Sequence, residues 1–255
     1  MSKKNKNSGA CKPKISKLGA TALVVILGVL SVYAGRFIVK HNREKISAQG
    51  EKARAKGNPR ADFKIVEYID FQCPACAKGS KIIRDYVAQY PTRIYVEMKY
   101  FPLSQMHKFA LLACQYAQCA ARQDKFWPMH DALIDDQSIW DRMLNAETMF
   151  REMAGKIGLD KAALDACLAD KETEKVILSM KEHGKSLGVQ STPTYFVNGK
   201  MSVGIKSLQA ELEKYFGPVK SPTPPVVSTT AASPVPSTPK SAPEPLHLLQ
   251  TPARQ

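Results

Sequence analysis

The chain lacks the features of several common protein classes. A structural zinc site needs two pairs of ligands at characteristic spacings. Among the six cysteines, Cys73 and Cys76 could form one pair, but Cys114 and Cys119 are too far apart within a helical pattern to form the second, so we expect no metal. A formal net charge of +14 suggests nucleic-acid binding. However, no zinc-finger, recognition-helix or aromatic-basic RNA motif is present, and much of the positive charge flanks an apolar segment instead. We therefore expect no nucleic-acid partner.

The N-terminal part has no acidic residue before its only long apolar run. Residues 1–17 contain six lysines, and residues 18–39 are apolar apart from Arg36 near the far end. About 20 apolar residues suffice to cross a bilayer, and the basic flank stays cytoplasmic. The length favours a retained inner-membrane anchor in contact with lipid. The alternative is a signal peptide cleaved before Gly35, which would leave a soluble periplasmic protein. Either way the remainder is exported.

Two further segments lack the apolar residues needed to fold. Residues 40–61 are predicted as a polar linker, either a frayed helix or a spacer, too short to hold a dimerisation domain, so a monomer is expected. Residues 217–255 hold 10 of the 17 prolines and no apolar periodicity, and are predicted to be a disordered tail. The folded domain is thus expected at residues 62–216.

The most informative stretch is FKIVEYIDFQCPAC, residues 63–76. It begins as a buried strand and continues, after Cys73-Pro74-Ala75-Cys76, into a helical pattern of apolar residues. A CxxC at a strand-to-helix junction is the thioredoxin-type redox signature. Only a thiolate attacks a disulfide, and the helix N-terminus favours that anion, so Cys73 is the predicted nucleophile. Cys76 lies one turn later, where it can close a disulfide, and Pro74 suits the first helical turn.

The rest of the domain alternates between strand and helix patterns. His107 and His130 fit no metal-ligand spacing, and Phe126, Trp127 and Met129 are expected in the core rather than in a groove. Strands are predicted at 93–103, 195–197 and 201–205, and helices at 106–121, 125–135, 148–157, 161–168, 172–187 and 206–216.

These motifs resemble the DsbA-like thiol:disulfide oxidoreductases, in the membrane-anchored or exported bacterial type. The residues that carry the resemblance are FQCPAC, Thr192-Pro193, and the run AQCAARQDKFWPMHDAL at 117–133, whose AxxC part is shortened here. The resemblance covers residues 62–216. It implies a thioredoxin-like α/β fold with a helical insertion at about 104–188, and no cofactor.

The resemblance also assigns roles to single residues. Glu67 would lie beneath the active-site disulfide and exchange a proton with Cys76 through water, whereas the strand pattern alone equally allows an outward-facing carboxylate. Pro193 would be cis beside the disulfide, rather than an ordinary trans proline at a strand start. Thr192, with Pro74 and Ala75, would then contact an extended substrate.

The three remaining cysteines of the domain suggest a second disulfide in an oxidising compartment. From the residues alone, Cys114–Cys119 stays possible, although a five-residue step on a helix points the side chains apart. The resemblance implies Cys119–Cys167 instead, because Cys167 lies in an ACL-type segment, and it leaves Cys114 free and buried.

The expected activity is disulfide exchange with extracytoplasmic proteins that contain cysteine pairs. Cys73 would form the mixed disulfide, Cys76 would resolve it, and a membrane redox partner would reset the site. The missing dimerisation domain favours an oxidase over an isomerase or reductase, but the threonine before Pro193 also occurs in isomerase-type members. A redox-inert binding or scaffold protein is the rival from another class.

Overall fold

A five-stranded mixed sheet forms the centre of the domain. The computed structural model describes residues 26–37 and 50–218. The sheet order is β1-β3-β2-β4-β5. Its strands are β1 (Ala55–Gly57), β2 (Phe63–Ile69), β3 (Ile94–Tyr100), β4 (Thr194–Val197) and β5 (Lys200–Val203). β2 runs parallel to β3, and the other three pairings are antiparallel. The strand that precedes the CxxC motif is therefore central in the sheet.

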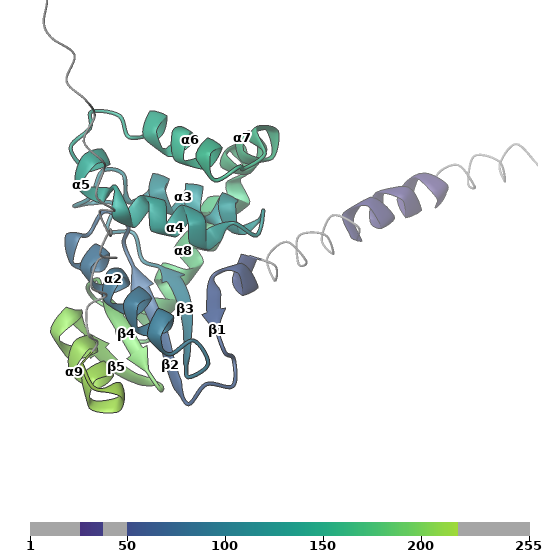
Figure 1. The fold of residues 1–255 in the computed structure, drawn as a ribbon. Coiled ribbons are helices and arrows are strands. Elements are labelled where there is room, and N and C mark those ends of the chain that lie inside the picture. The colour runs from purple at the N-terminus through teal and green to yellow at the C-terminus, as the bar shows by residue number, and fades with distance from the viewer. Residues whose placement is uncertain (1–25, 38–49, 219–255) are drawn as a thin grey trace, which may run out of the picture. The chain divides into compact units, whose positions relative to one another are not determined.

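Helices cover the sheet and form the insertion between β3 and β4, as predicted (Figure 1). Helix α2 packs beside α9 under one part of the sheet, and α3 contacts α4, α6, α7 and α8. The helices are α2 (Pro74–Gln89), α3 (Ala110–Ala121), α4 (Phe126–Asp135), α5 (Gln137–Trp140), α6 (Glu147–Lys156), α7 (Lys161–Ala169), α8 (Lys171–Ser186) and α9 (Gly204–Phe216).

Strand β2 is apolar on both faces because both faces are covered. Alternate side chains of a strand point to opposite faces. Ile65 packs in one cluster with Ile83 of α2, while Tyr68 packs in another with Phe101 and Val189. The continuous apolar character that predicted a buried strand thus has a direct structural cause.

The insertion packs around α3, whose alanines and cysteines are all buried in an apolar cluster that continues to Ile69 of β2 and Tyr100 of β3. Phe126 and Met129 of α4 lie in this core at 1% and 0% exposure, which confirms their prediction as core residues. Trp127 is partly buried against the same core. The short helix α5 was not predicted, because four residues carry too little pattern.

The predicted polar linker at 40–61 is wrong in its C-terminal part. Residues 50–53 are helical, and β1 pairs with β3 at the edge of the sheet. Between them Arg54 is only 2% exposed, and its guanidinium donates to the Gln118 side chain at 2.7 Å. Polar composition indicated a linker, but paired polar groups and edge-strand hydrogen bonds allow the segment to be part of the domain.

The predicted ends of the chain lie largely outside the described residues. Of the apolar run at 18–39, the structure describes only 26–37, which is helical. Within the part of the chain that the structure describes, no helix combines the length and apolar character needed to cross a bilayer. The predicted tail is described only at Gly217 and Pro218.

Candidate functional site

Cys73 is the N-cap residue of α2, at the end of the turn that follows β2. Its backbone N–H donates to the Asp70 carbonyl at 3.1 Å, and Pro74 occupies the first helical turn. The Cys73 thiol is 8% exposed and donates to the Thr192 carbonyl at 3.5 Å. Cys73 and Cys76 are both free thiols in the structure.

The surroundings of the two sulfurs shift their pKa values in opposite directions. The pKa of the Cys73 thiol is lowered to about 5, first by a hydrogen bond from the Cys76 thiol. Backbone N–H groups of Cys76 and Ala75 lower it further, against the opposing effect of burial. Cys76 is fully buried, and burial followed by the neighbouring Cys73 raises its pKa well above the ordinary value. At neutral pH the negative charge therefore resides on Cys73.

The segment that carries Pro193 faces this pair of sulfurs. The Thr192–Pro193 peptide is cis, as the resemblance implies. The Pro193 carbonyl accepts from the Gly204 N–H at 2.9 Å, and the Thr194 hydroxyl donates to the Ser191 carbonyl at 2.7 Å. The loop is thereby fixed from both sides, with the Thr192 carbonyl beside Cys73.

Glu67 lies beneath the site and does not face solvent. It is fully buried, and the Ser80 hydroxyl of α2 donates to its carboxylate at 3.5 Å. Burial raises the pKa of Glu67 to about 8, although Ser80 and the charge of Lys56 lower it. The charge of Glu67 also acts on Cys76. The outward-facing alternative is therefore wrong, and the carboxyl is protonated at neutral pH.

Two residues of this buried region escaped the sequence analysis. Lys56 of β1 lies in the segment predicted as a linker, and its ammonium sits 3.9 Å from the centre of the Trp127 ring. Burial lowers the pKa of Lys56. Tyr195 of β4 was predicted only as a strand residue, yet its fully buried side chain reaches under α2 near Glu67 and both site cysteines. Neither carries a local signal, because each position is set by long-range strand pairing.

Gly79 of α2 makes room for Tyr195. A β-carbon at this position would overlap the Tyr195 hydroxyl oxygen and lie 3.3 Å from the adjoining ring carbon. Gly79→Ala should therefore destabilise the protein by about 1–3 kcal/mol, the usual cost of overpacking. Tyr195→Phe removes the overlapping oxygen, so the alanine should cost less in that background. Urea unfolding of the four members of this double-mutant cycle measures the coupling.

A matched control is available in α6. A β-carbon on Gly155 would meet no heavy atom within 4 Å. Gly155→Ala should stabilise the protein by about 0.5–1 kcal/mol through helix propensity alone. If Gly79→Ala had the same effect with Tyr195 present as in the Tyr195→Phe background, that result would contradict the proposed contact.

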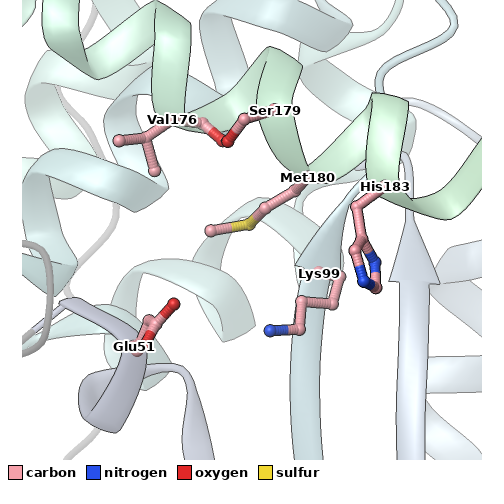
Figure 2. A pocket seen from close by; sticks show the side chains of 6 residues that line it. All are labelled: Glu51, Lys99, Val176, Ser179, Met180 and His183. Atoms are coloured by element: carbon pink, nitrogen blue, oxygen red, sulfur yellow. The ribbon is translucent and has the colours of Figure 1, made fainter.

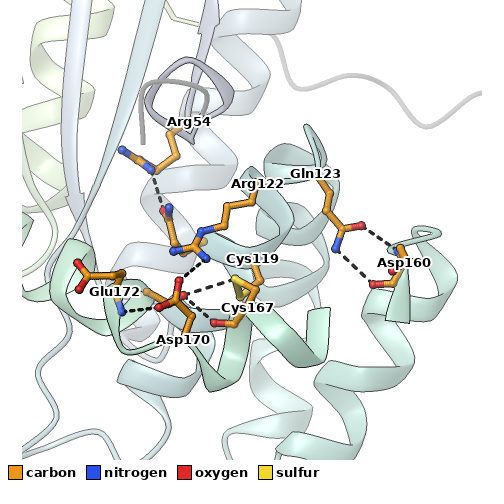
Figure 3. Close-up of a disulfide and its surroundings, with 10 residues drawn as sticks. Arg54, Cys119, Arg122, Gln123, Asp160, Cys167, Asp170 and Glu172 are labelled. Atoms are coloured by element: carbon orange, nitrogen blue, oxygen red, sulfur yellow. Dashed lines mark hydrogen bonds and ion pairs between the residues drawn. A yellow bond between two sulfur atoms is a disulfide. The ribbon is translucent and has the colours of Figure 1, made fainter. Parts of the chain in front are cut away.

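The second disulfide joins Cys119 of α3 to Cys167 of α7, the pair that the resemblance implies (Figure 3). Cys114 is free and buried. Next to the disulfide, Arg122 forms an ion pair with Asp170 at 3.0 Å, and the Thr173 hydroxyl donates to the Cys167 carbonyl at 2.7 Å. The bridge therefore ties α7 and the start of α8 to the centre of the insertion.

His107 and His130 each lie within hydrogen-bonding distance of a carboxylate. His107 lies 2.8 Å from the fully buried Asp70, and His130, which is nearly fully buried, lies 2.8 Å from Asp131. Among the described residues, no group of three or more His, Cys, Asp or Glu side chains is placed to hold a metal.

A pocket of about 380 Å³ lies elsewhere, between α8, β3 and the helical residues before β1 (Figure 2). It contains neither of the site cysteines. Its lining combines charged and apolar side chains: Glu51, Lys99, Val176, Ser179, Met180 and His183.

Comparison with known proteins agrees with this geometry. The family model described as Thioredoxin matches residues 49–214. The curated Na(+)/H(+) antiporter NhaA 3 of Salinispora tropica is 31% identical over 160 residues, which cover 63% of this chain but 24% of the antiporter. The chain thus spans about a quarter of the length of that relative, and the antiporter name belongs to the relative alone.

Solved structures share the fold at low sequence identity. A thioredoxin-like oxidoreductase from Silicibacter pomeroyi is 24% identical with a TM-score of 0.52, covering 63% of this chain and 90% of that one. Alpha-DsbA1 from Wolbachia pipientis is 21% identical with a TM-score of 0.53, covering 63% and 87%. The chain therefore belongs to the thioredoxin family, with the fold of its DsbA-like thiol:disulfide oxidoreductases.

Proposed function

We propose that the chain is a thiol:disulfide oxidoreductase that forms disulfide bonds in extracytoplasmic proteins. The observation that carries the proposal is the asymmetry of the CxxC pair. Cys73 sits on a helix N-terminus with a pKa lowered to about 5, while the buried Cys76 has a raised pKa. A low-pKa thiolate is the leaving group that disulfide exchange requires.

The reaction begins from the Cys73–Cys76 disulfide. A substrate thiolate attacks the Cys73 sulfur, and the bond between the two enzyme sulfurs breaks. Cys76 leaves as a thiolate whose raised pKa makes it basic, and the protonated Glu67 carboxyl supplies the proton through water. A second substrate thiolate attacks the substrate sulfur of the mixed disulfide and releases the Cys73 thiolate. Two electrons pass to the enzyme, and the substrate gains a disulfide.

Substrate contact is assigned to the surface around Cys73. Pro74 and Ala75 lie on the accessible start of α2, and the Thr192 carbonyl lies beside the attacking sulfur. We propose that an extended substrate segment lies along Thr192 and Pro193, with its cysteine directed at Cys73.

The low pKa of Cys73 favours the oxidase direction over isomerase or reductase. A thiolate that is stabilised in the reduced protein makes the disulfide form a stronger oxidant. A dedicated membrane redox partner would then remove the two electrons from Cys73 and Cys76 after each turnover. No added dimerisation domain is needed for this role, so the proposed enzyme acts as a monomer.

The proposed location follows from the N-terminal sequence. The lysine-rich segment at 1–17 and the apolar run at 18–39 favour an inner-membrane anchor with the N-terminus in the cytoplasm. The catalytic domain then lies in the periplasm, where thiols are exposed to oxidation. Cleavage of the apolar run would give the same domain as a soluble periplasmic protein.

Trapping of mixed disulfides tests the proposed function. Cys76→Ala removes the sulfur that would release a substrate from Cys73, so the Cys73 thiolate should attack the disulfide of an oxidised model substrate, expel one substrate sulfur as a thiolate and stay joined to the other as a mixed disulfide. Non-reducing electrophoresis followed by mass spectrometry identifies the linked cysteine. The variant Cys73→Ala/Cys76→Ala is the control and should trap nothing. A redox-inert scaffold would trap no substrate in either variant, which would overturn the proposal.

A further inference from the structure

The turn that carries Cys73 is held by backbone and side-chain groups of the segment between β3 and β4. Residues 70–73 connect β2 to α2. The buried Asp70 carboxylate accepts from the Leu103 N–H at 2.8 Å and pairs with His107.

The Gln72 side chain accepts from the Phe109 N–H at 2.6 Å. The same Gln72 side chain donates to the carboxylate of Asp141, directly after α5, at 2.7 Å. Asp70 and Gln72 therefore connect this turn to the helical insertion.

Gln137 makes the contact closest to the reactive sulfur. It is the first residue of α5, and its side-chain amide donates to the Phe71 carbonyl at 2.5 Å and to the Cys73 carbonyl at 3.0 Å. The side chain is 7% exposed, so water competes little for these two bonds.

The helix that carries Gln137 is itself firmly held. Trp140, at its other end, is fully buried, packs edge-on against Phe150 and donates from its ring to the Leu133 carbonyl at 2.8 Å. The amide of Gln137 therefore approaches the turn from a fixed position, and its two donors set the distance between the Phe71 and Cys73 carbonyls.

The Cys73 carbonyl oxygen accepts two hydrogen bonds, one from the helix backbone and one from the Gln137 side chain. It accepts from the Ala77 N–H at 3.2 Å, which closes the first turn of α2, and from Gln137. The orientation of this peptide unit determines where the Cys73 sulfur lies relative to the backbone N–H groups of Ala75 and Cys76. A group that fixes the carbonyl therefore fixes the sulfur on the helix N-terminus.

We propose that Gln137 is a positioning residue of the redox site, whose side-chain amide holds the backbone carbonyls of Phe71 and Cys73 and so keeps the Cys73 sulfur within reach of the first N–H groups of α2. The inference rests on the proposed function in that it concerns the same thiolate. It also gives the helical insertion a role in the chemistry besides covering the sheet.

The test replaces the amide without changing its length. Gln137→Met keeps an unbranched side chain of similar size and removes both donors. The titration midpoint of the Cys73 thiolate should rise by about one pH unit, a tenfold loss of thiolate affinity. The redox equilibrium constant with glutathione should move about tenfold toward the disulfide form, because the reduced form loses its stabilised anion.

A matched control separates positioning from stability. Gln123 also makes two side-chain hydrogen bonds to one backbone unit, that of Asp160, but it lies beside α7 (Figure 3). Gln123→Met should lower the free energy of unfolding by less, because its two hydrogen bonds are exposed to solvent, and should leave the thiolate midpoint and the redox equilibrium unchanged. If Gln137→Met does not fold, Gln137→Glu serves, since its side chain keeps the shape: an ionised carboxylate cannot donate and a protonated carboxyl donates only one hydrogen bond, so the midpoint should rise in either state.

The outcome is distinguishable from failure of the proposed function. An unchanged thiolate midpoint and redox equilibrium in a folded Gln137→Met or Gln137→Glu protein would overturn the role of Gln137, whatever the trapping experiment shows. Conversely, a raised midpoint together with no trapped substrate would support the positioning role and overturn only the proposed activity.

Discussion

Raising the pH from about 5 to about 9 should stabilise the reduced protein relative to the oxidised protein by about 5 kcal/mol. The pKa of Cys73 is lowered to about 5 from an ordinary value of 9.0. Each unit of difference between the folded and unfolded pKa corresponds to about 1.4 kcal/mol. Since the Cys73 thiol is only 8% exposed, solvent screens this difference weakly.

The direction follows from proton binding. A folded pKa below the unfolded pKa means that the unfolded chain binds more protons between the two values, so stability rises with pH across that window. The contribution of Cys73 is thus complete above about 9 and is lost as the pH falls through about 5. The raised pKa of Cys76 acts in the opposite direction only above its ordinary value of 9.0.

The stability of the reduced protein must be compared with that of the oxidised protein because Glu67 also titrates in this pH range. Its pKa is raised to about 8, so ionising it costs stability as the pH rises from about 4.5 to about 8. This loss affects both the reduced and the oxidised protein and largely cancels in their difference. Urea unfolding of each form at several pH values gives that difference. A difference that stays constant between pH 5 and pH 8 would contradict the prediction.

Loss of the second disulfide is the other change with a large expected effect. Cys119 and Cys167 are 48 residues apart, and a bridge closing such a loop restricts the unfolded chain. The double variant Cys119→Ala/Cys167→Ala should lose about 2–4 kcal/mol of unfolding free energy. The helical insertion should unfold more readily than the sheet in this variant, because the bridge joins α3 to α7 within the insertion.

The experiment is best done in a Cys73→Ser background, in which the CxxC site cannot form its own disulfide. Reductant should then destabilise the protein with Cys119 and Cys167 present and leave the double variant unaffected. Cys114→Ala serves as the control, since Cys114 is free, and this variant should keep its sensitivity to reductant. Equal stability with and without reductant in all three proteins would contradict the structural role of the bridge.

Local pattern was sufficient for the elements next to the motif. The β-branched and aromatic run at 63–69 forms a strand, and the spacing after Cys76 continues as a helix through Gln89. These features depend on side chains within a few residues of one another. The disulfide and the cis peptide before Pro193 followed from the resemblance, because neither leaves a signature in periodicity.

The residues that escaped prediction act across long distances in the sequence. Lys56 belongs to the edge strand β1, and the polar residues around it led to the prediction of a linker. Tyr195 reaches Gly79 because β4 lies beside β2, and Gln137 reaches Cys73 from a four-residue helix. The inward direction of the Glu67 side chain was also left open by the sequence, since a strand alone does not reveal which face is covered.

The acidity of a single thiol tests the account most directly. Thiolate absorbance of the reduced protein, corrected with Cys73→Ser, should follow a titration with a midpoint near the pKa of about 5 expected for Cys73. The same midpoint should govern the rate of alkylation of Cys73 as a function of pH. A midpoint near 9.0, the ordinary value of a cysteine thiol, would contradict the account.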